Sequence, residues 1–295
     1  MQLILLTFPA VPPTAALPAP HYLVIRCPDE PGLIFRITEV LFRHGLNIVR
    51  NDEFVEPTGP TFFMRTEVAG DFQAEALLSD LRAALPAAAE VRLGDPRPRN
   101  IVVMATKEHH CLSELLVRHA FDELGARIMA VISNHALLGP LTTQFGVPFH
   151  HVSHEGLSRA QHEAAVGAVL DHYQPEYVVL AKYMRILSPG FVAPYADRLI
   201  NIHHSSLPAF VGANPYGQAF ERGVKIIGAT AHFVNNELDQ GPIIAQSVIP
   251  VDHTHSAADM AQAGRDVEKI VLARSLRLVF NGRVFVHHNK TIIFE

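Results

Sequence analysis

The hydrophobic pattern of residues 21–94 alternates between two periods. Apolar residues two positions apart predict strands, and apolar residues three or four positions apart predict helices. In chain order, the expected elements are a strand at 21–27, a helix at 33–45, strands at 46–56 and 61–69, a helix at 72–85 and a strand at 90–93. This βαββαβ order is the split βαβ plan of the ferredoxin-like fold.

From residue 100 onward, the apolar runs are less interrupted by polar residues. The expected elements are strands at 101–106, 126–134, 147–152 and 177–181, helices at 112–124, 136–146 and 157–173, and a long last helix at 256–280. Near-continuous apolar strands that alternate with helices indicate a mostly parallel, Rossmann-like sheet. The predicted fold class is therefore α/β, with a ferredoxin-like domain in front of a Rossmann-like domain.

Proline-rich segments mark the limits of these domains. In residues 1–20 an apolar run is cut short by Pro9 and has no basic residue before it, which predicts an N-terminal extension rather than a secretory signal. Residues 95–99 alternate proline with polar residues and predict a stiff linker. The expected domains are residues 21–94 and 100–295.

Composition excludes several classes of protein. The 295 residues are 48% hydrophobic, which is enough for a core, and their formal charge of −5 leaves no basic surplus for a nucleic-acid backbone. No apolar run approaches the about 20 residues of a membrane helix. We therefore expect neither a nucleic-acid nor a membrane partner. Only two cysteines, Cys27 and Cys111, are present, which favours the reducing cytoplasm.

Candidate chemistry lies where strands of the second domain end, because parallel sheets bind ligands at the carboxyl ends of their strands. Asn201 and His203 end an apolar strand and are two positions apart, so both face one side of an extended chain. An amide stabilises an oxyanion and an imidazole transfers protons. Asp239, in a later turn, could orient that imidazole or hold a water. Taken alone, an Asn-x-His pair is a weak signal, because it is more often the polar edge of a buried strand.

Two common kinds of site have no support in the sequence. The loop after the strand at 101–106 reads Lys-Glu-His-His-Cys and has no glycine, so the dinucleotide fingerprint is missing. His253 and His255, or His150 and His154, have tolerable spacings for a metal, but no cysteine or aspartate partners complete a ligand set. We therefore expect no metal and no cofactor.

The motifs at these strand ends resemble the folate-dependent formyltransferase family. In that family Asn-x-His-x-Ser precedes His-x-Val-x-x-x-x-Asp-x-Gly-Pro. Here the first segment begins at Asn201, and the second begins at His232, has Asp239 as its aspartate and ends at Pro242. The resemblance implies a folate substrate, with Asn201, His203 and Asp239 as catalytic residues. It also implies substrate contacts at Met184, Arg185, Leu187, Asn235 and Glu237. His109, at the end of the first strand, is a further candidate for contact with the folate or the water.

The first domain resembles an ACT domain, a small amino-acid-binding regulatory module. The similarity rests on Asp-Glu-Pro-Gly-Leu at 29–33, which opens the first helix, and on Asn47-Ile48, which enters the second strand. A glycine at this turn lets a ligand approach the backbone, and a helix N-terminus can hold a carboxylate. The resemblance implies Asp29, Gly32 and Asn47 as contacts of a regulatory ligand, and sheets paired between chains in a homo-oligomer. A capped turn without a ligand is the alternative.

The two domains in this order resemble one branch of the family, the formyltetrahydrofolate deformylases. Stretches that support this branch are 62–65, 110–112, 212–216, 264–268 and 289–291. The resemblance implies hydrolysis of 10-formyltetrahydrofolate to tetrahydrofolate and formate, which supplies purine and one-carbon metabolism. Ser206, Gly217 and Asn236 depart from the pattern of the branch and leave the details of the pocket open.

Two other functions remain as alternatives. An acceptor-dependent formyltransferase for a phosphorylated amine needs a glycine-rich phosphate cradle after the first strand, and the sequence at 109–111 provides none. A catalytically silent folate-binding regulator would not need an intact Asn201, His203 and Asp239. Hydrolysis is therefore favoured, although the sequence does not decide whether His203 or Asp239 is the general base.

Overall fold

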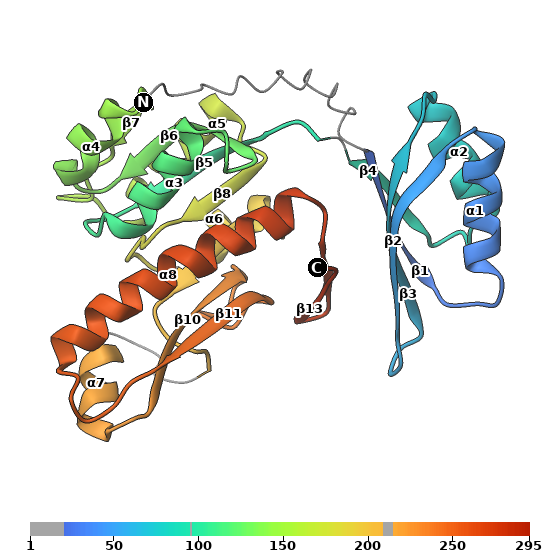
Figure 1. The fold of residues 1–295 in the computed structure, drawn as a ribbon. Coiled ribbons are helices and arrows are strands. Elements are labelled where there is room, and N and C mark those ends of the chain that lie inside the picture. The colour runs from blue at the N-terminus through green and yellow to red at the C-terminus, as the bar shows by residue number, and fades with distance from the viewer. Residues whose placement is uncertain (1–20, 95, 209–214) are drawn as a thin grey trace, which may run out of the picture. The chain divides into compact units, whose positions relative to one another are not determined.

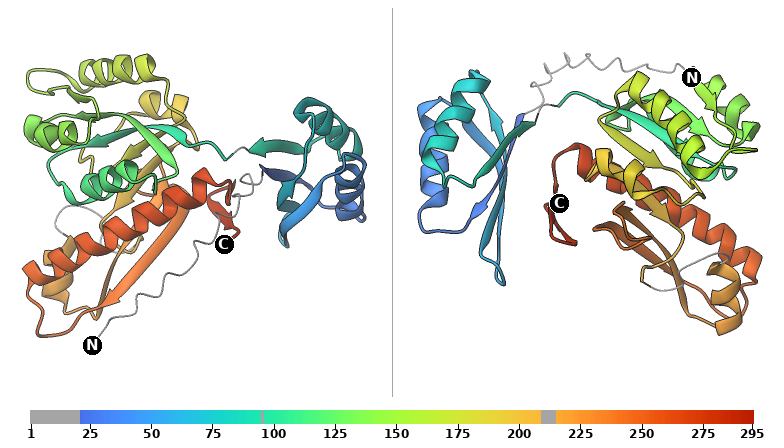
Figure 2. Two further views of the ribbon diagram at one scale, coloured as in Figure 1. Left: turned by 45° about the horizontal axis from the view of Figure 1, so that its top comes forward. Right: turned by 180° about the vertical axis from the view of Figure 1, so that it is seen from behind.

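The computed structural model describes residues 21–94, 96–208 and 215–295, and the chain divides into two units, Met1–Pro96 and Arg97–Glu295 (Figures 1 and 2). The N-terminal extension, Asp95 of the predicted linker and Gly212–Asn214 of the family-like stretch lie outside the described residues. Within the described ranges, no helix combines the length and the apolar character that a membrane crossing requires.

The first unit is a four-stranded antiparallel sheet with two helices on one face (Figure 1). Its elements are β1 (His21–Pro28), α1 (Leu33–Arg43), β2 (Asn47–Glu56), β3 (Thr61–Ala69), α2 (Ala74–Ala84) and β4 (Glu90–Gly94). The strand order β2-β3-β1-β4 confirms the predicted ferredoxin-like fold. Ile37 of α1 and Leu77 of α2 are fully buried against Met64 of β3, so the core lies between the helices and the sheet.

The second unit contains a seven-stranded sheet in the order β11-β10-β9-β8-β5-β6-β7. Its strands are β5 (Arg99–Ala105), β6 (Ala126–Ser133), β7 (Phe149–His151), β8 (Tyr177–Leu180), β9 (Leu199–His203), β10 (Ile226–Phe233) and β11 (Ile243–Pro250). The first five are parallel to one another, and β10 and β11 are antiparallel to their neighbours. The sheet is thus mostly parallel, as predicted.

Helices cover both faces of this sheet (Figure 2). They are α3 (His110–Ala120), α4 (Gly139–Gln144), α5 (Arg159–Tyr173), α6 (Pro189–Val192), α7 (Pro215–Arg222) and α8 (Ala257–Phe280), with short 3₁₀ turns at Ala136–Leu138 and Ala193–Tyr195 and a final hairpin of β12 (Val284–His287) and β13 (Lys290–Ile293). Val103 faces the core made with α3 and α8, and Val102 faces the core made with α5 and α6. Successive residues of β5 are buried on opposite faces, which explains its unbroken apolar run.

A buried group of polar side chains connects α8 to the sheet. Glu268 of α8 is 1% exposed. Its carboxylate accepts hydrogen bonds from His110 Nε2 at 2.8 Å and Tyr216 OH at 2.7 Å, and it lies 3.2 Å from Lys182 Nζ. Burial alone would raise the pKa of Glu268, but these hydrogen bonds and the charge of Lys182 lower it to about 2. Glu268 is therefore ionised inside the fold, with its charge balanced by Lys182.

The pH dependence of stability tests this buried carboxylate. Because the folded-state pKa of Glu268 lies near 2, below the usual 4.5, its contribution is fully present above about pH 4.5 and is lost as the pH falls toward 2. A shift of this size corresponds to about 3 kcal/mol. We expect Glu268→Gln to lower the free energy of urea unfolding at neutral pH, and this difference from the wild type to shrink in acid. A difference that stays constant down to about pH 3 would contradict the assignment.

Candidate functional site

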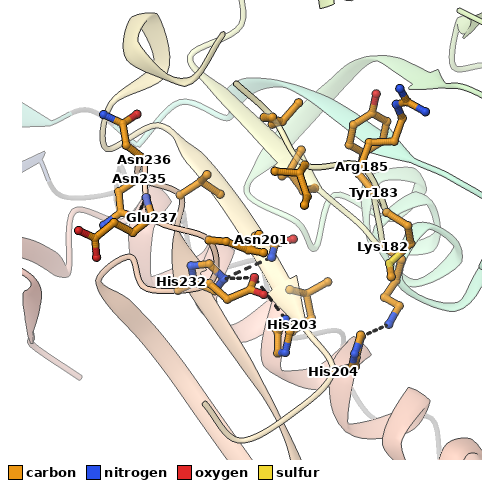
Figure 3. Close-up of a pocket in the computed structure, with 18 residues that line it drawn as sticks. Lys182, Tyr183, Arg185, Asn201, His203, His204, His232, Asn235, Asn236 and Glu237 are labelled. Atoms are coloured by element: carbon orange, nitrogen blue, oxygen red, sulfur yellow. Dashed lines mark hydrogen bonds and ion pairs between the residues drawn. The ribbon is translucent and has the colours of Figure 1, made fainter. Parts of the chain in front are cut away.

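A cavity of about 340 Å³ lies where β8 and β9 end (Figure 3). One wall is the segment that follows β8, residues 182–187, and the opposite wall is the loop that follows β10, residues 234–239. The floor carries Asn201 and His203 of β9 together with His232 of β10. The cavity thus occupies the position where parallel sheets bind ligands.

His203 and Asp239 meet in this cavity. The Nδ1 atom of His203 lies 3.3 Å from Oδ1 of Asp239, and their side chains are 7% and 12% exposed. A carboxylate only accepts hydrogen bonds, so Nδ1 of His203 carries a proton and donates a hydrogen bond to Asp239. The other ring nitrogen, Nε2, is buried without a hydrogen-bond partner among the described residues. It is therefore the atom of His203 that remains available to a bound molecule.

Asn201 is oriented by His232. The antiparallel pairing of β9 and β10 places the two residues opposite each other, and Asn201 Nδ2 donates to His232 Nε2 at 3.2 Å. His232 Nδ1 donates to the carbonyl oxygen of Phe233 at 2.8 Å. The proton of His232 thus lies on Nδ1, and the ring is neutral. Burial lowers the pKa of His232, which also favours the neutral ring. The second N–H bond of Asn201 Nδ2 is not used by His232.

The loop of residues 234–242 brings Asp239 to His203 by folding back onto β10. Phe233 N donates to Pro242 O at 2.9 Å, and a Cβ at Gly241 would lie 1.8 Å from the carbonyl oxygen of Phe233, so only glycine fits there. Asp239 itself has a φ of 55°, a left-handed conformation that costs energy for a residue with a side chain. Its carboxylate is held in a strained turn at the cavity.

The charge of Asp239 follows from its neighbours. Burial would raise the pKa of this carboxyl, but the hydrogen bond from His203 and the imidazoles of His203, His232 and His204 lower it. Asp239 is therefore ionised at neutral pH. The cavity combines a carboxylate, an oriented amide and an imidazole with one available nitrogen, which suits attack of water on a carbonyl carbon.

Most of the expected substrate contacts line the same cavity. Met184, Arg185 and Leu187 lie on one wall, and Asn235 and Glu237 lie on the other (Figure 3).

His109 does not line this cavity. It precedes α3 and lines a second cavity of about 270 Å³, together with Ser113 of α3 and Gln262 and Arg265 of α8. Its position at the start of α3 turns it toward α8, which the sequence of the loop did not reveal.

The expected regulatory residues belong to the first unit and lie at different ends of α1. Gly32, with a φ of 88°, precedes α1, and Asn47 begins β2 after that helix has ended. An 11-residue helix is about 16 Å long. Within one chain, the structure therefore does not bring Asn47 to Asp29 and Gly32.

Three further residues of the cavity have no role that the sequence predicts. His232 belongs to the family motif without an assigned role, and Lys182 and His204 belong to no motif that points to the site, yet all three line the cavity. Successive residues of a strand face opposite sides, so His204 was not expected beside His203. Because β9 ends at His203, the chain turns there, and the two rings stack with centroids 4.6 Å apart. The His-His dipeptide was the only available signal.

One cluster offers ligand atoms of the kinds that metals bind. Atoms of His110, Cys111 and Glu268 lie within 4.8 Å of one another. Lys182 Nζ already balances the carboxylate at 3.2 Å, and burial raises the pKa of the Cys111 thiol well above its usual value. A metal would have to displace the ammonium and deprotonate the thiol, so these residues fit a cation poorly.

Comparisons with known proteins agree with this architecture. The formyl transferase family model matches residues 99–276, and the ACT domain model matches residues 21–86. The chain is 54% identical to the formyltetrahydrofolate deformylase of Haemophilus influenzae, over 92% of this chain and 98% of that protein. It is 42% identical to the deformylase of Bacillus subtilis, over 92% and 93%.

Solved structures of deformylases and of transformylases match this chain to different extents. The formyltetrahydrofolate deformylase of Pseudomonas syringae matches with a TM-score of 0.91 and 40% identity, over 95% of this chain and 96% of that chain. A glycinamide ribonucleotide transformylase of Symbiobacterium toebii matches with a TM-score of 0.64 and 30% identity, over 67% and 95%. The transformylase thus covers a smaller share of this chain than the deformylase does. With both domain models matched in order and the identity extending across nearly the whole length, this chain belongs to the formyltetrahydrofolate deformylase family.

Proposed function

We propose that this chain hydrolyses 10-formyltetrahydrofolate to tetrahydrofolate and formate, and so supplies formate to purine and one-carbon metabolism. The observation that carries the proposal is the convergence of Asn201, His203 and Asp239 on one cavity. No cofactor takes part, because the substrate itself carries the formyl group and water is the second reactant. The proposed domains remain residues 21–94 and 100–295, joined by 95–99. The two free cysteines, both buried, support a cytoplasmic location.

In the proposed mechanism, water attacks the formyl carbon and an oxyanion develops. Asn201 donates the N–H bond that His232 does not use, and protonated His203 donates from Nε2. One preorganised donor is worth about 3–4 kcal/mol of transition-state stabilisation. Asp239 keeps His203 oriented and charged, and its carboxylate positions or deprotonates the water. The N10 atom leaves with a proton from His203 or from a relayed water.

The proposed folate site lies between the two cavity walls. Residues 184–187 and 235–238 would enclose the pterin ring, mainly through backbone groups. Met184 is 57% exposed and Leu238 is 55% exposed, so each offers an apolar side chain to a flat ring. His109, which lines the second cavity, is placed outside this proposed contact set.

We further propose that the ACT domain binds an amino acid through Asp29, Gly32 and Asn47. Because α1 separates Asn47 from the other two within one chain, a ligand that touches all three needs residues from two chains. Pairing of ACT sheets in a homo-oligomer would supply the second chain.

The first test is release of formate without any acceptor. Purified protein incubated with 10-formyltetrahydrofolate alone should produce tetrahydrofolate and formate in equal amounts, because water is the nucleophile. An acceptor-dependent formyltransferase would release product only after an amine is added, and a silent regulator would release none in either case. Formate and absorbance assays in parallel separate these outcomes.

Substitutions in the proposed catalytic group should abolish turnover without unfolding the protein. We expect Asp239→Asn or His203→Ala to lower kcat at least ~10²-fold, because each removes a group that acts on the water or the oxyanion. Steady-state kinetics and circular dichroism check this result. Asp171→Asn, an exposed carboxylate on α5, serves as the matched control and should keep normal kcat. Near-normal activity in both catalytic variants would overturn the assignment.

Binding of an amino acid to the ACT domain should appear as thermal stabilisation. A ligand that binds only the folded state raises the apparent Tm in proportion to ln(1 + [L]/Kd). Among the free amino acids, we expect at least one to raise the Tm of the wild type, and Asn47→Ala to remove that rise. Glu75→Gln, an exposed residue of α2, should keep it. If no amino acid changes the Tm or the rate of formate release, the turn at Gly32 has only a structural role.

A further inference from the structure

A buried ammonium group lies beside the proposed catalytic residues. Lys182 is 4% exposed, follows β8 and lines the same cavity as His203 (Figure 3). Its Nζ atom lies 3.1 Å from His204 Nδ1, 3.2 Å from the carboxylate of Glu268 and 3.9 Å from that of Glu108. Its φ of 62° is left-handed, which a lysine adopts only when its surroundings compensate the cost. The backbone of Lys182 is therefore strained, and its surroundings hold the ammonium group in place in spite of that strain.

The contact with Lys182 determines the protonation of His204. An ammonium group donates hydrogen bonds and cannot accept them, so Nδ1 of His204 must be the acceptor. The ring proton then lies on Nε2, and the imidazole is neutral. Protonation of His204 at Nδ1 would place two donors 3.1 Å apart and break the contact.

The state of His204 matters because its ring is stacked on that of His203. The two planes are 24° apart and the centroids 4.6 Å apart. Two charged imidazoles at this distance would repel each other, whereas a neutral ring leaves His203 free to carry the proton next to Asp239. His232, on the other side of Asp239, is also neutral. Of the three imidazoles, His203 is then the one left to carry charge.

Glu268 holds Lys182 from the opposite side. Its carboxylate is fixed by His110 of α3 and by Tyr216 of α7, so two further helices determine where the ammonium lies. The contacts run from Glu268 in α8 through Lys182 and His204 to His203. Glu268, Lys182 and His204 contribute no atom to the reaction themselves.

We propose that Lys182, anchored by Glu268, is a positioning residue for the hydrolysis: it fixes His204 as a neutral ring that holds His203 against Asp239. This inference rests on the proposed function. It assigns to Lys182 and His204 an effect on the chemical step rather than on folate binding.

Kinetics of a charge-balanced variant test the inference. Lys182→Met alone would leave Glu268 as an unpaired buried charge and so endanger folding, whereas Lys182→Met with Glu268→Gln removes both charges. We expect this double variant to lower kcat at least about tenfold and to change KM less than about twofold, because a displaced His203 stabilises the transition state less while the proposed folate contacts stay in place. Lys269→Met, the neighbouring but partly exposed lysine of α8, is the matched control and should keep kcat. Unchanged kcat in the folded double variant would overturn the inference.

Additivity shows whether Lys182 acts through His204. His204→Asn keeps an acceptor near the position of Nδ1 but removes the stacked ring. If Lys182 works only through that ring, combining His204→Asn with the charge-balanced pair should lower kcat no further than His204→Asn alone. Losses that multiply in the combined variant would mean that Lys182 acts independently, and would overturn the proposed route.

The tautomer of His204 provides a readout that does not depend on activity. Long-range ¹H–¹⁵N spectra of the wild type, assigned with His204→Asn, should show an unprotonated Nδ1 and a protonated Nε2 around neutral pH. A protonated Nδ1 would overturn the inference. If the wild type released no formate, the proposed function would fail; if it released formate at a rate that the charge-balanced variant matches, only the role of Lys182 would fail.

Discussion

The contact between His203 and Asp239 depends on one close approach of the backbone. The loop after β10 must return against the strand it has just left, and it does so where a side chain at Gly241 would overlap the carbonyl oxygen of Phe233. That return places the carboxylate 3.3 Å from the imidazole and closes one wall of the cavity. The strained turn at Asp239 is the cost of this geometry, and the apolar core beneath β9 and β10 offsets it.

Behind this contact lies a second set of charges that is fully enclosed by protein. Glu268 and Lys182 are 1% and 4% exposed, and ions so buried are tolerated only when they are paired and hydrogen-bonded. Here His110 and Tyr216 complete the set from α3 and α7. Hydrophobic side chains in place of Glu268 and Lys182 could fill the same volume, so stability alone does not explain why charged residues are present. The position of Lys182 next to His204 links the charged pair to the reaction.

The fold itself does not choose between hydrolysis and transfer. The second unit shares its architecture with glycinamide ribonucleotide transformylases, such as that of Symbiobacterium toebii with a TM-score of 0.64. Because one fold serves several reactions, the outcome depends on side chains at the strand ends and on what the cavity admits. The ionised Asp239, the oriented Asn201 and the Nε2 atom of His203, which has no hydrogen-bond partner among the described residues, would serve attack by water or by an amine alike. What favours water is the loop at 107–111, which has no glycine-rich cradle for a phosphorylated acceptor.

The sequence by itself determined the elements, both folds and the spacing that points to Asn201, His203 and Asp239. The elements follow from local periodicity, and the pairing of Asn201 with His203 follows from residues two positions apart on one strand. Asp239 was implied by the family motif that the later segment resembles. Only the tertiary structure decided that His109 faces another cavity, that Asn47 lies far from Gly32, and that Lys182, His204 and Glu268 form one chain of contacts. The separation of Asn47 from Gly32 follows from the length of α1. The contacts of Lys182, His204 and Glu268 depend on how β8, β9 and α8 pack, and a contact between residues 86 positions apart leaves no periodic trace in the sequence.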